Sequence, residues 1–134
     1  MSYVPKYILK RMIPADAMRA VEDGVEITVV NVLGPLAIDE IPDDYMSYLD
    51  KLQVKVDGTP LTEEQKAGIK IKHEGEVFDR DNLKEAVGRT VPVGGKLVLF
   101  APVTGLAVGE EHEVEIRVEL DSPFEVKFAR VLQA

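Results

Sequence analysis

The chain has 134 residues, 24 acidic and 16 basic side chains, and a formal net charge of −8. Nucleic-acid phosphates and anionic membranes are bound by clustered Lys and Arg, so this acidic chain is expected to bind neither. Cysteine is absent, which excludes disulfides and thiolate metal sites. The length suits one domain over residues 1–134, and no segment has the pattern of a signal peptide or a membrane span, so we expect a cytoplasmic protein.

The first third of the chain predicts two strands separated by a short helix. We expect a strand over residues 6–13 and a helix over residues 15–23. Pro14 suits the first position of that helix, and Gly24 suits the left-handed residue that ends it. Residues 25–33 are rich in β-branched side chains and nearly continuously apolar, which indicates a central strand covered on both sides or a strand buried in an interface.

Residues 34–49 keep no period of 2 or 3.6 for long, yet they carry many apolar side chains among prolines and acidic residues. A loop this apolar must pack on something, either on the core of its own domain or on a partner. The candidates for a partner interface are Leu36, Ile38, Ile41, Tyr45, Met46 and Tyr48.

Turn and cap signals organise the middle of the chain. Residues 52–56 alternate and run into Asp57-Gly58, which predicts a two-residue hairpin turn. Thr62-Glu63-Glu64-Gln65 has the form of a capping box and predicts a one-turn helix. Residues 69–73 alternate as a strand, which we expect to pair with the residues that follow Gly75.

Two further signals follow. The stretch Asn82-Leu83-Lys84-Glu85 resembles a second capping box and predicts a short helix that ends at Gly88. The pair Gly94-Gly95 predicts a hairpin between residues 90–93 and 96–101, because both glycines can adopt positive φ.

The clearest strand signal lies near the C-terminus. Over residues 112–120 apolar side chains alternate strictly with charged ones, as in a strand of an antiparallel sheet with one dry face and one wet face. Alternation resumes over residues 124–128. The sum of these elements predicts a mainly β protein: an antiparallel two-sheet β-sandwich with two or three short helical insertions.

No motif in the chain specifies a chemistry. None of its serines lies in a Gly-x-Ser-x-Gly turn, and no glycine-rich phosphate-binding motif is present. His73 and His112 each lie at the end of a strand; we interpret them as structural, with metal binding or catalysis as the alternative. Asp79-Arg80-Asp81-Asn82 resembles part of a calcium loop, but Leu83 stands where the third ligand is needed, so a helix cap is the better interpretation.

Apolar and turn positions over roughly residues 15–120 occur in an order that resembles the small beta subunit of C-glycoside deglycosidases and its relatives. The positions that carry the resemblance are Ala17 to Val25, Leu52 to Gly58, Ile69-Lys70-Ile71, Val77-Phe78, Leu83, Gly94 or Gly95, Leu106-x-x-Gly109 and His112-x-Val114-x-Ile116. Such subunits are β-sandwiches that accompany a larger barrel subunit related to sugar isomerases. The resemblance implies that the catalytic residues and any divalent metal belong to the barrel subunit, so it assigns no catalytic, cofactor or metal-binding residue to this chain.

Three functions follow as hypotheses. The first is a non-catalytic accessory subunit that packs on a larger barrel-type sugar-processing subunit and forms part of a C-glycoside lyase-like complex. The second is a homo-oligomeric binding module whose apolar loop pairs symmetrically with its own copy. The third is a small metal-dependent enzyme that uses His73 and His112.

Overall fold

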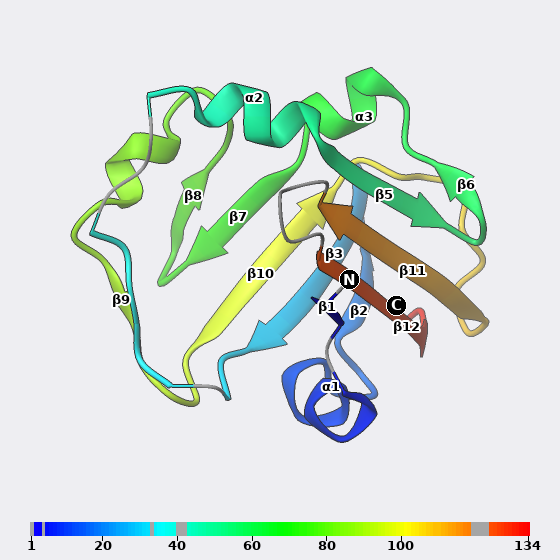
Figure 1. Ribbon diagram of the computed structural model, residues 1–134. Coiled ribbons are helices and arrows are strands. Elements are labelled where there is room, and N and C mark those ends of the chain that lie inside the picture. Colours follow the sequence, from blue (N-terminus) through cyan, green and yellow to red (C-terminus); the bar gives the residue numbers. More distant parts are fainter. Residues whose placement is uncertain (1, 4, 33, 40–42, 119–123) are drawn as a thin grey trace.

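The computed structural model describes residues 2–3, 5–32, 34–39, 43–118 and 124–134 (Figure 1). One five-stranded sheet has the order β1 (Ser2–Tyr3), β12 (Phe124–Val131), β11 (Glu111–Val118), β5 (Leu52–Val56), β6 (Thr59–Pro60). The second has the order β2 (Met18–Val21), β3 (Gly24–Val30), β10 (Lys96–Ala101), β7 (Lys70–His73), β8 (Glu76–Phe78). A small third sheet consists of β4 (Leu36–Ala37) and β9 (Thr90–Val91). The described helices are α1 (Lys6–Met12), α2 (Tyr45–Asp50), α3 (Glu63–Ala67) and the 3₁₀ turn η1 (Leu83–Ala86). The prediction of a mainly β sandwich with short helices is confirmed.

The core lies between the two five-stranded sheets. In one sheet Val114 of β11 is paired with Val56 of β5 and with Phe128 of β12, and all three are buried. Met18 of β2 and Ile27 of β3, from the other sheet, belong to the same buried cluster. Of the alternating residues predicted over 112–120, Val114 and Ile116 lie on the inner face of the sandwich and pack with side chains of the opposite sheet, while residues 119 and 120 lie outside the described residues.

The turn predicted at Asp57-Gly58 and the capping box predicted at Thr62 are confirmed. Asp57 and Gly58 both have positive φ and form the two-residue connection of the β5–β6 hairpin. The Thr62 hydroxyl accepts a hydrogen bond from the Gln65 amide at 3.1 Å, and the Gln65 side chain accepts one from the Thr62 amide at 2.9 Å. Both halves of a capping box therefore begin α3.

The N-terminal predictions are wrong. Of residues 6–13, Lys6–Met12 form helix α1 rather than a strand, and Ile13 is the extended residue that ends the helix. Leu9 and Ile13, four residues apart, are both buried against the core. Residues 15–23 form strand β2 and a turn rather than a helix. Gly24 does not end a helix: it begins β3, and a Cβ there would lie 2.2 Å from the Ala101 carbonyl oxygen, so close packing against β10 requires glycine.

Two predictions in the second half are also corrected. Gly94 lies in a turn with positive φ, and Gly95 directly follows it, but β9 and β10 do not pair with each other. Instead β9 pairs with β4, and β10 pairs with β3 and β7. The expected helix after Asn82 is the 3₁₀ turn η1, and the Asn82 side chain makes no cap hydrogen bond to it.

The C-terminal residues join the two sheets. Beyond β12, the Gln133 amide donates to the Met18 carbonyl at 2.9 Å and the Gln133 carbonyl accepts from the Ala20 amide at 2.8 Å, both on β2 of the opposite sheet. Leu132 between these sheets is 1% exposed. The Arg130 guanidinium donates to the Ile13 carbonyl at 2.7 Å and holds the end of α1 against β12.

His112 is a buried charged link between the β5–β6 turn and the start of β11. Its Nδ1 lies 2.7 Å from Asp57 Oδ2 and its Nε2 lies 2.8 Å from the Ala107 carbonyl oxygen. Both partners are acceptors, so only the doubly protonated imidazolium can donate to both. The Ala107 hydrogen bond and then the Asp57 hydrogen bond raise the pKa of His112 above its ordinary 6.5. Hydrogen bonds from His112 and from the Glu113 amide lower the pKa of Asp57 below its ordinary 3.8.

The small β4–β9 sheet is tied to the end of β3 by the Asn31 side chain. Its Nδ2 donates to the Gly34 carbonyl at 2.7 Å and to the Val91 carbonyl at 3.0 Å. Backbone hydrogen bonds between Ile38 and Arg89 (2.9 Å) and between Gly88 and Ile38 (2.7 Å) extend the pairing. We call residues 34–39 together with residues 87–93 the ribbon; it runs along one edge of the molecule (Figure 1).

A His112→Gln variant is expected to be less stable than the wild type by about 1–3 kcal/mol at about pH 5.5, because a buried hydrogen-bonded cation is removed. Since the folded pKa of His112 is raised, its contribution is fully present below 6.5 and is lost as the pH rises through the folded value. The Asp57 contribution is lost as the pH falls through its lowered pKa. Urea unfolding across this range measures the difference. In an Asp57→Asn background the pH dependence of the His112→Gln effect should shrink, and an unchanged dependence would contradict the pairing.

An Asn31→Ala variant is expected to loosen the ribbon locally. Without the side-chain amide, the Ile38 and Gly88 amides should exchange with deuterium roughly tenfold faster, whereas β11 amides should keep their protection. Hydrogen exchange followed by NMR measures both. Gln53→Ala, at an exposed position on β5 of the opposite sheet, is the control. Equal protection of Ile38 in the wild type and in Asn31→Ala would show that other contacts hold the ribbon.

Candidate functional site

The structure tests part of the predicted interface. Leu36 lies in β4 and is 52% exposed, and Ile38, just after β4, is half-buried. Ile41 lies outside the described residues. Tyr45, Met46 and Tyr48 belong to α2, but their side chains are outside the described part of the structure. The segment that the sequence predicts as one irregular loop thus contains a strand of the ribbon and a helix.

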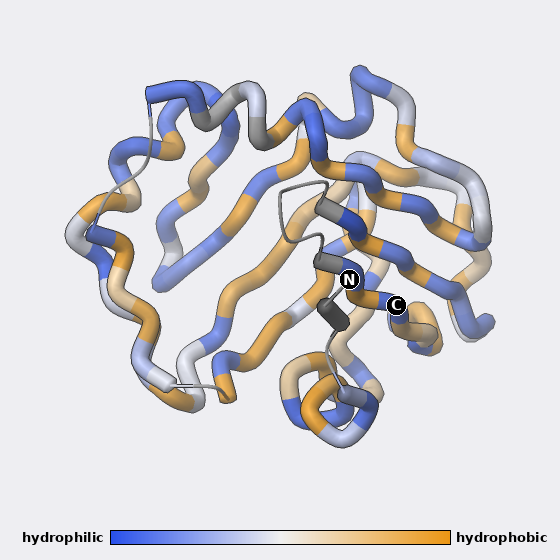
Figure 2. Tube along the Cα trace, viewed as in Figure 1, coloured by the Kyte–Doolittle hydropathy of each residue, from blue (hydrophilic) through white to orange (hydrophobic). Residues whose placement is uncertain are grey.

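The ribbon exposes apolar side chains along its length. Leu36 is 52% exposed, Val87 44% and Val93 60%. Figure 2 shows apolar segments along this edge of the molecule, where β4 and β9 run side by side. Val91, which is paired with Leu36, is 1% exposed and anchors the ribbon to the body. Apolar side chains gathered on a protruding element are typical of a surface that contacts another protein.

Arg89 of the ribbon interacts with an acidic, a histidine and an aromatic side chain. Arg89, between Val87 and Val91, forms an ion pair with Glu76. Its Nη1 also lies 3.2 Å from Nδ1 of His73, and its guanidinium lies 4.9 Å from the centre of the Phe78 ring. Because a guanidinium only donates, Nδ1 of His73 is the acceptor of this hydrogen bond. His73 therefore supports the base of the ribbon.

The two histidines are not brought together as one site. His73 ends β7 in one sheet, and His112 lies near the start of β11 in the other. Among the residues that the structure describes, no group of three or more His, Asp or Glu side chains could hold a metal ion. The geometry gives the metal-enzyme hypothesis no support beyond the sequence.

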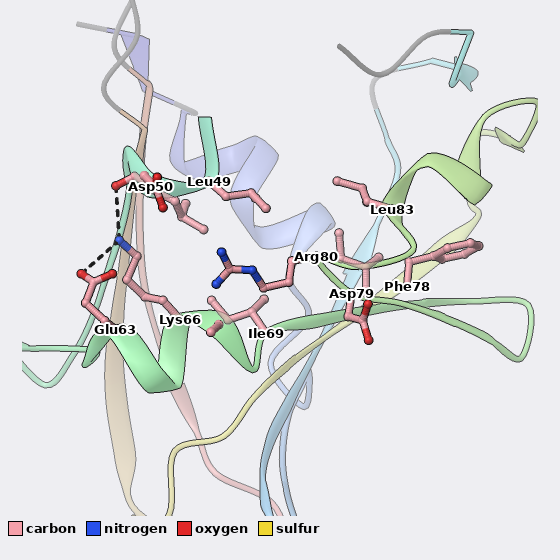
Figure 3. A pocket seen from close by; sticks show the side chains of 12 residues that line it. Leu49, Asp50, Glu63, Lys66, Ile69, Phe78, Asp79, Arg80 and Leu83 are labelled. Atoms are coloured by element: carbon pink, nitrogen blue, oxygen red, sulfur yellow. Dashed lines mark hydrogen bonds and ion pairs between the residues drawn. The ribbon is translucent and has the colours of Figure 1, made fainter. Parts of the chain in front are cut away.

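A cavity of about 80 Å³ lies beneath α2 (Figure 3). Its apolar lining comes from α2, β5, α3, β7, β8 and η1. Its polar lining includes Lys66 of α3 and Arg80 of the loop after β8. The described residues that line it are Leu49, Asp50, Leu52, Glu63, Lys66, Ala67, Ile69, Ile71, Phe78, Asp79, Arg80 and Leu83. Charged and apolar side chains both line this space, and its volume is smaller than the roughly 300–1,000 Å³ of a typical small-molecule site.

Sequence reasoning missed Arg80. The stretch Asp79-Arg80-Asp81-Asn82 was a better match to a helix cap than to a calcium loop, but it forms a tight turn of its own. Asp79 Oδ1 accepts from the Asp81 amide at 2.9 Å and from the Asn82 amide at 3.2 Å, and Asn82 Oδ1 accepts from the Asp79 amide at 2.7 Å. This turn fixes the backbone from which the Arg80 side chain extends into the cavity (Figure 3). Three charged residues stand between Phe78 and Leu83, and no local pattern distinguishes Arg80 from Asp79 and Asp81.

Within the described ranges, no helix has the length and apolar content needed to cross a membrane. Comparison with models of known protein families gives no match to this chain, and comparison with curated proteins gives none either.

Proposed function

We propose that this protein is a non-catalytic accessory subunit that packs on a larger barrel-type sugar-processing subunit. The observation that carries the proposal is the ribbon with its exposed Leu36, Val87 and Val93. The order of turn and apolar positions, which resembles the beta subunit of C-glycoside deglycosidases, supports the class of partner. In this role the partner supplies the catalytic residues and any divalent metal.

The ribbon suits a docking role because it is apolar but firmly attached. Asn31 and the buried Val91 fix its position, so little conformational entropy is lost when a partner orders it. Covering the exposed parts of Leu36, Val87 and Val93 contributes roughly 1 kcal/mol for each side chain. This sum is too small for a stable complex, so the interface must extend beyond the ribbon, and the neighbouring residues 43–49 are the expected continuation.

The double substitution Leu36→Asp with Val93→Asp is expected to abolish partner binding, because it places two charges in an apolar contact that would have to be desolvated. The tagged full-length chain is purified from its native cells, and the recovered proteins are identified by mass spectrometry. The wild type should retain a barrel-type subunit in near-stoichiometric amount. The double variant should lose it while keeping the wild-type unfolding midpoint.

Val108→Asp is the matched control. Val108 is 52% exposed, as Leu36 is, but it lies in the turn before β11 and not on the ribbon. This variant should bind the partner as the wild type does. Light scattering on the purified chain separates the alternative: a symmetric oligomer that Leu36→Asp with Val93→Asp dissociates would favour the homo-oligomeric module. A wild-type monomer recovered without a barrel subunit would overturn the proposal.

A further inference from the structure

The segment between β10 and β11 crosses from one five-stranded sheet to the other (Figure 1), and His112 holds part of it in place. We propose that residues 105–108 form a proton-dependent latch, which the doubly protonated His112 closes and the neutral His112 releases. This inference goes beyond the accessory role and does not depend on the ribbon. It rests on the two acceptors at the His112 ring, on the few contacts of the segment and on the glycines that bound it.

The latch has a single polar attachment. Among the hydrogen bonds of the described residues, the only one that reaches residues 105–108 is the bond from His112 Nε2 to the Ala107 carbonyl oxygen, at 2.8 Å. Three of these four residues are exposed, and Leu106 is half-buried against the core. Segments with so few contacts open locally while the rest of the structure stays folded. Loss of this one bond therefore frees the latch without unfolding the sandwich.

Glycines bound the latch and allow it to move. Gly105 has a φ of 83° and Gly109 a φ of 88°, and a Cβ atom added at either would meet nothing within 4 Å. Glycine reaches other φ values at little cost, so rotation at these two positions can turn the Ala107 carbonyl away from the ring. The flanking chain remains attached, because the Val103 side chain is buried and the Gly109 amide donates to the Leu132 carbonyl at 2.8 Å.

The His112 ring needs both of its protons to hold both of its neighbours. Asp57 Oδ2 lies 2.7 Å from Nδ1, the Ala107 carbonyl oxygen lies 2.8 Å from Nε2, and the residue is only 6% exposed. A neutral imidazole carries one proton and presents a lone pair at its other nitrogen. The proton stays on Nδ1, because a hydrogen bond to a carboxylate is stronger than one to a carbonyl. The Nε2 lone pair then faces the Ala107 oxygen, and these two acceptors repel each other.

Charged groups around the ring come from three elements. Asp57 of the β5–β6 turn and Glu110, directly before β11, both favour the protonated ring. Arg130 of β12 is paired with His112 and disfavours a second cation, but its guanidinium donates to two carbonyls at the end of α1. The acidic residues on either side of His112 in β11 lie on the opposite face of the strand.

The direction of the pH dependence follows from these groups. The hydrogen bond to the Ala107 carbonyl, and then the one to Asp57, raise the pKa of His112 above its ordinary 6.5. A group whose folded pKa is raised keeps its stabilising contribution below the ordinary value and loses it as the pH rises through the folded value. The latch is therefore closed below pH 6.5 and opens at a higher pH, as His112 loses a proton.

The test follows the wild-type chain by NMR from about pH 5.5 to about pH 9.5. A long-range proton–nitrogen correlation of the imidazole should show both His112 nitrogens protonated at low pH and only Nδ1 protonated at high pH. The Ala107 methyl group reports the backbone of the latch, because it has no rotamers and does not exchange with water. Its order parameter should fall by roughly a third with the midpoint of the His112 titration. The methyl groups of Val114, which is 1% exposed, should keep theirs.

Two variants hold the latch in its two states. Asparagine places its amide near the position of Nδ1, so His112→Asn can donate to Asp57 but does not reach Ala107, and the latch should be mobile at every pH. Glutamine places its amide near Nε2, so His112→Gln can keep the Ala107 bond, and the latch should be ordered at every pH. The pH dependence of the Ala107 methyl group should disappear in both.

A third variant moves the midpoint. Asp57→Asn should lower the pH midpoints of the His112 titration and of the Ala107 methyl signal together, by roughly one unit, because the carboxylate that favours the protonated ring is removed. Asparagine tolerates the positive φ of position 57. Asp81→Asn, which removes an equal charge from an exposed position in the turn after β8, is the control and should leave both midpoints unchanged.

Three results would overturn the proposal. The first is a His112 ring that keeps both protons to the highest pH, or a neutral ring with its proton on Nε2. The second is an Ala107 methyl order parameter that stays constant while His112 titrates in the wild type. The third is a methyl midpoint that does not follow the His112 midpoint in the folded Asp57→Asn variant.

Discussion

The arrangement of the two sheets depends on the last residues of the chain. Gln133 continues from β12 in one sheet and exchanges backbone hydrogen bonds with β2 of the other, and Leu132 fills the space between them. The Arg130 guanidinium donates a hydrogen bond to the Ile13 carbonyl at the end of α1, so this helix is attached to the same end of the sandwich. With that end of the sandwich closed by backbone pairing, the loops between the other strands are free to form surface features, and the ribbon and the cavity are both built from them.

The two buried histidines each connect parts of the sandwich through hydrogen bonds. The imidazole of His112 lies between the Asp57 carboxylate and the Ala107 carbonyl. It therefore joins the β5–β6 turn to β11, the strand that pairs with β5. His73 instead accepts from Arg89 and braces the ribbon. Each ring has a hydrogen-bond partner in a distant part of the chain, Asp57 for His112 and Arg89 for His73, so a histidine at the end of a strand is compatible with a structural role.

The sequence predicts what is decided locally. The alternation over residues 112–120, the Asp57-Gly58 turn and the capping box at Thr62 each depend on a few adjacent residues. The turn and the capping box are confirmed, and the strand is confirmed over Glu111–Val118, since residues 119 and 120 lie outside the described residues. Errors arise where distant residues decide. The segment 6–13 is too short to distinguish the period of a strand from that of a helix. Glycine is required at position 24 because the Ala101 carbonyl, 77 positions later in the sequence, leaves no room for a Cβ atom. The partner of β9 is β4, and no local pattern indicates that pairing or the direction of Arg80.

The ribbon and the cavity share one segment of chain. The 3₁₀ turn η1 carries Leu83 into the cavity wall, and Val87 and Gly88, directly after it, belong to the ribbon. Ala86 at the end of η1 is 5% exposed, and the Gly88 amide two residues later donates to the Ile38 carbonyl at 2.7 Å. The buried end of η1 therefore fixes the point where the chain enters the ribbon, as the Asn31 side chain fixes the carbonyl of Val91. The ribbon keeps its apolar side chains exposed because it is attached to the body at both of these points rather than through those side chains.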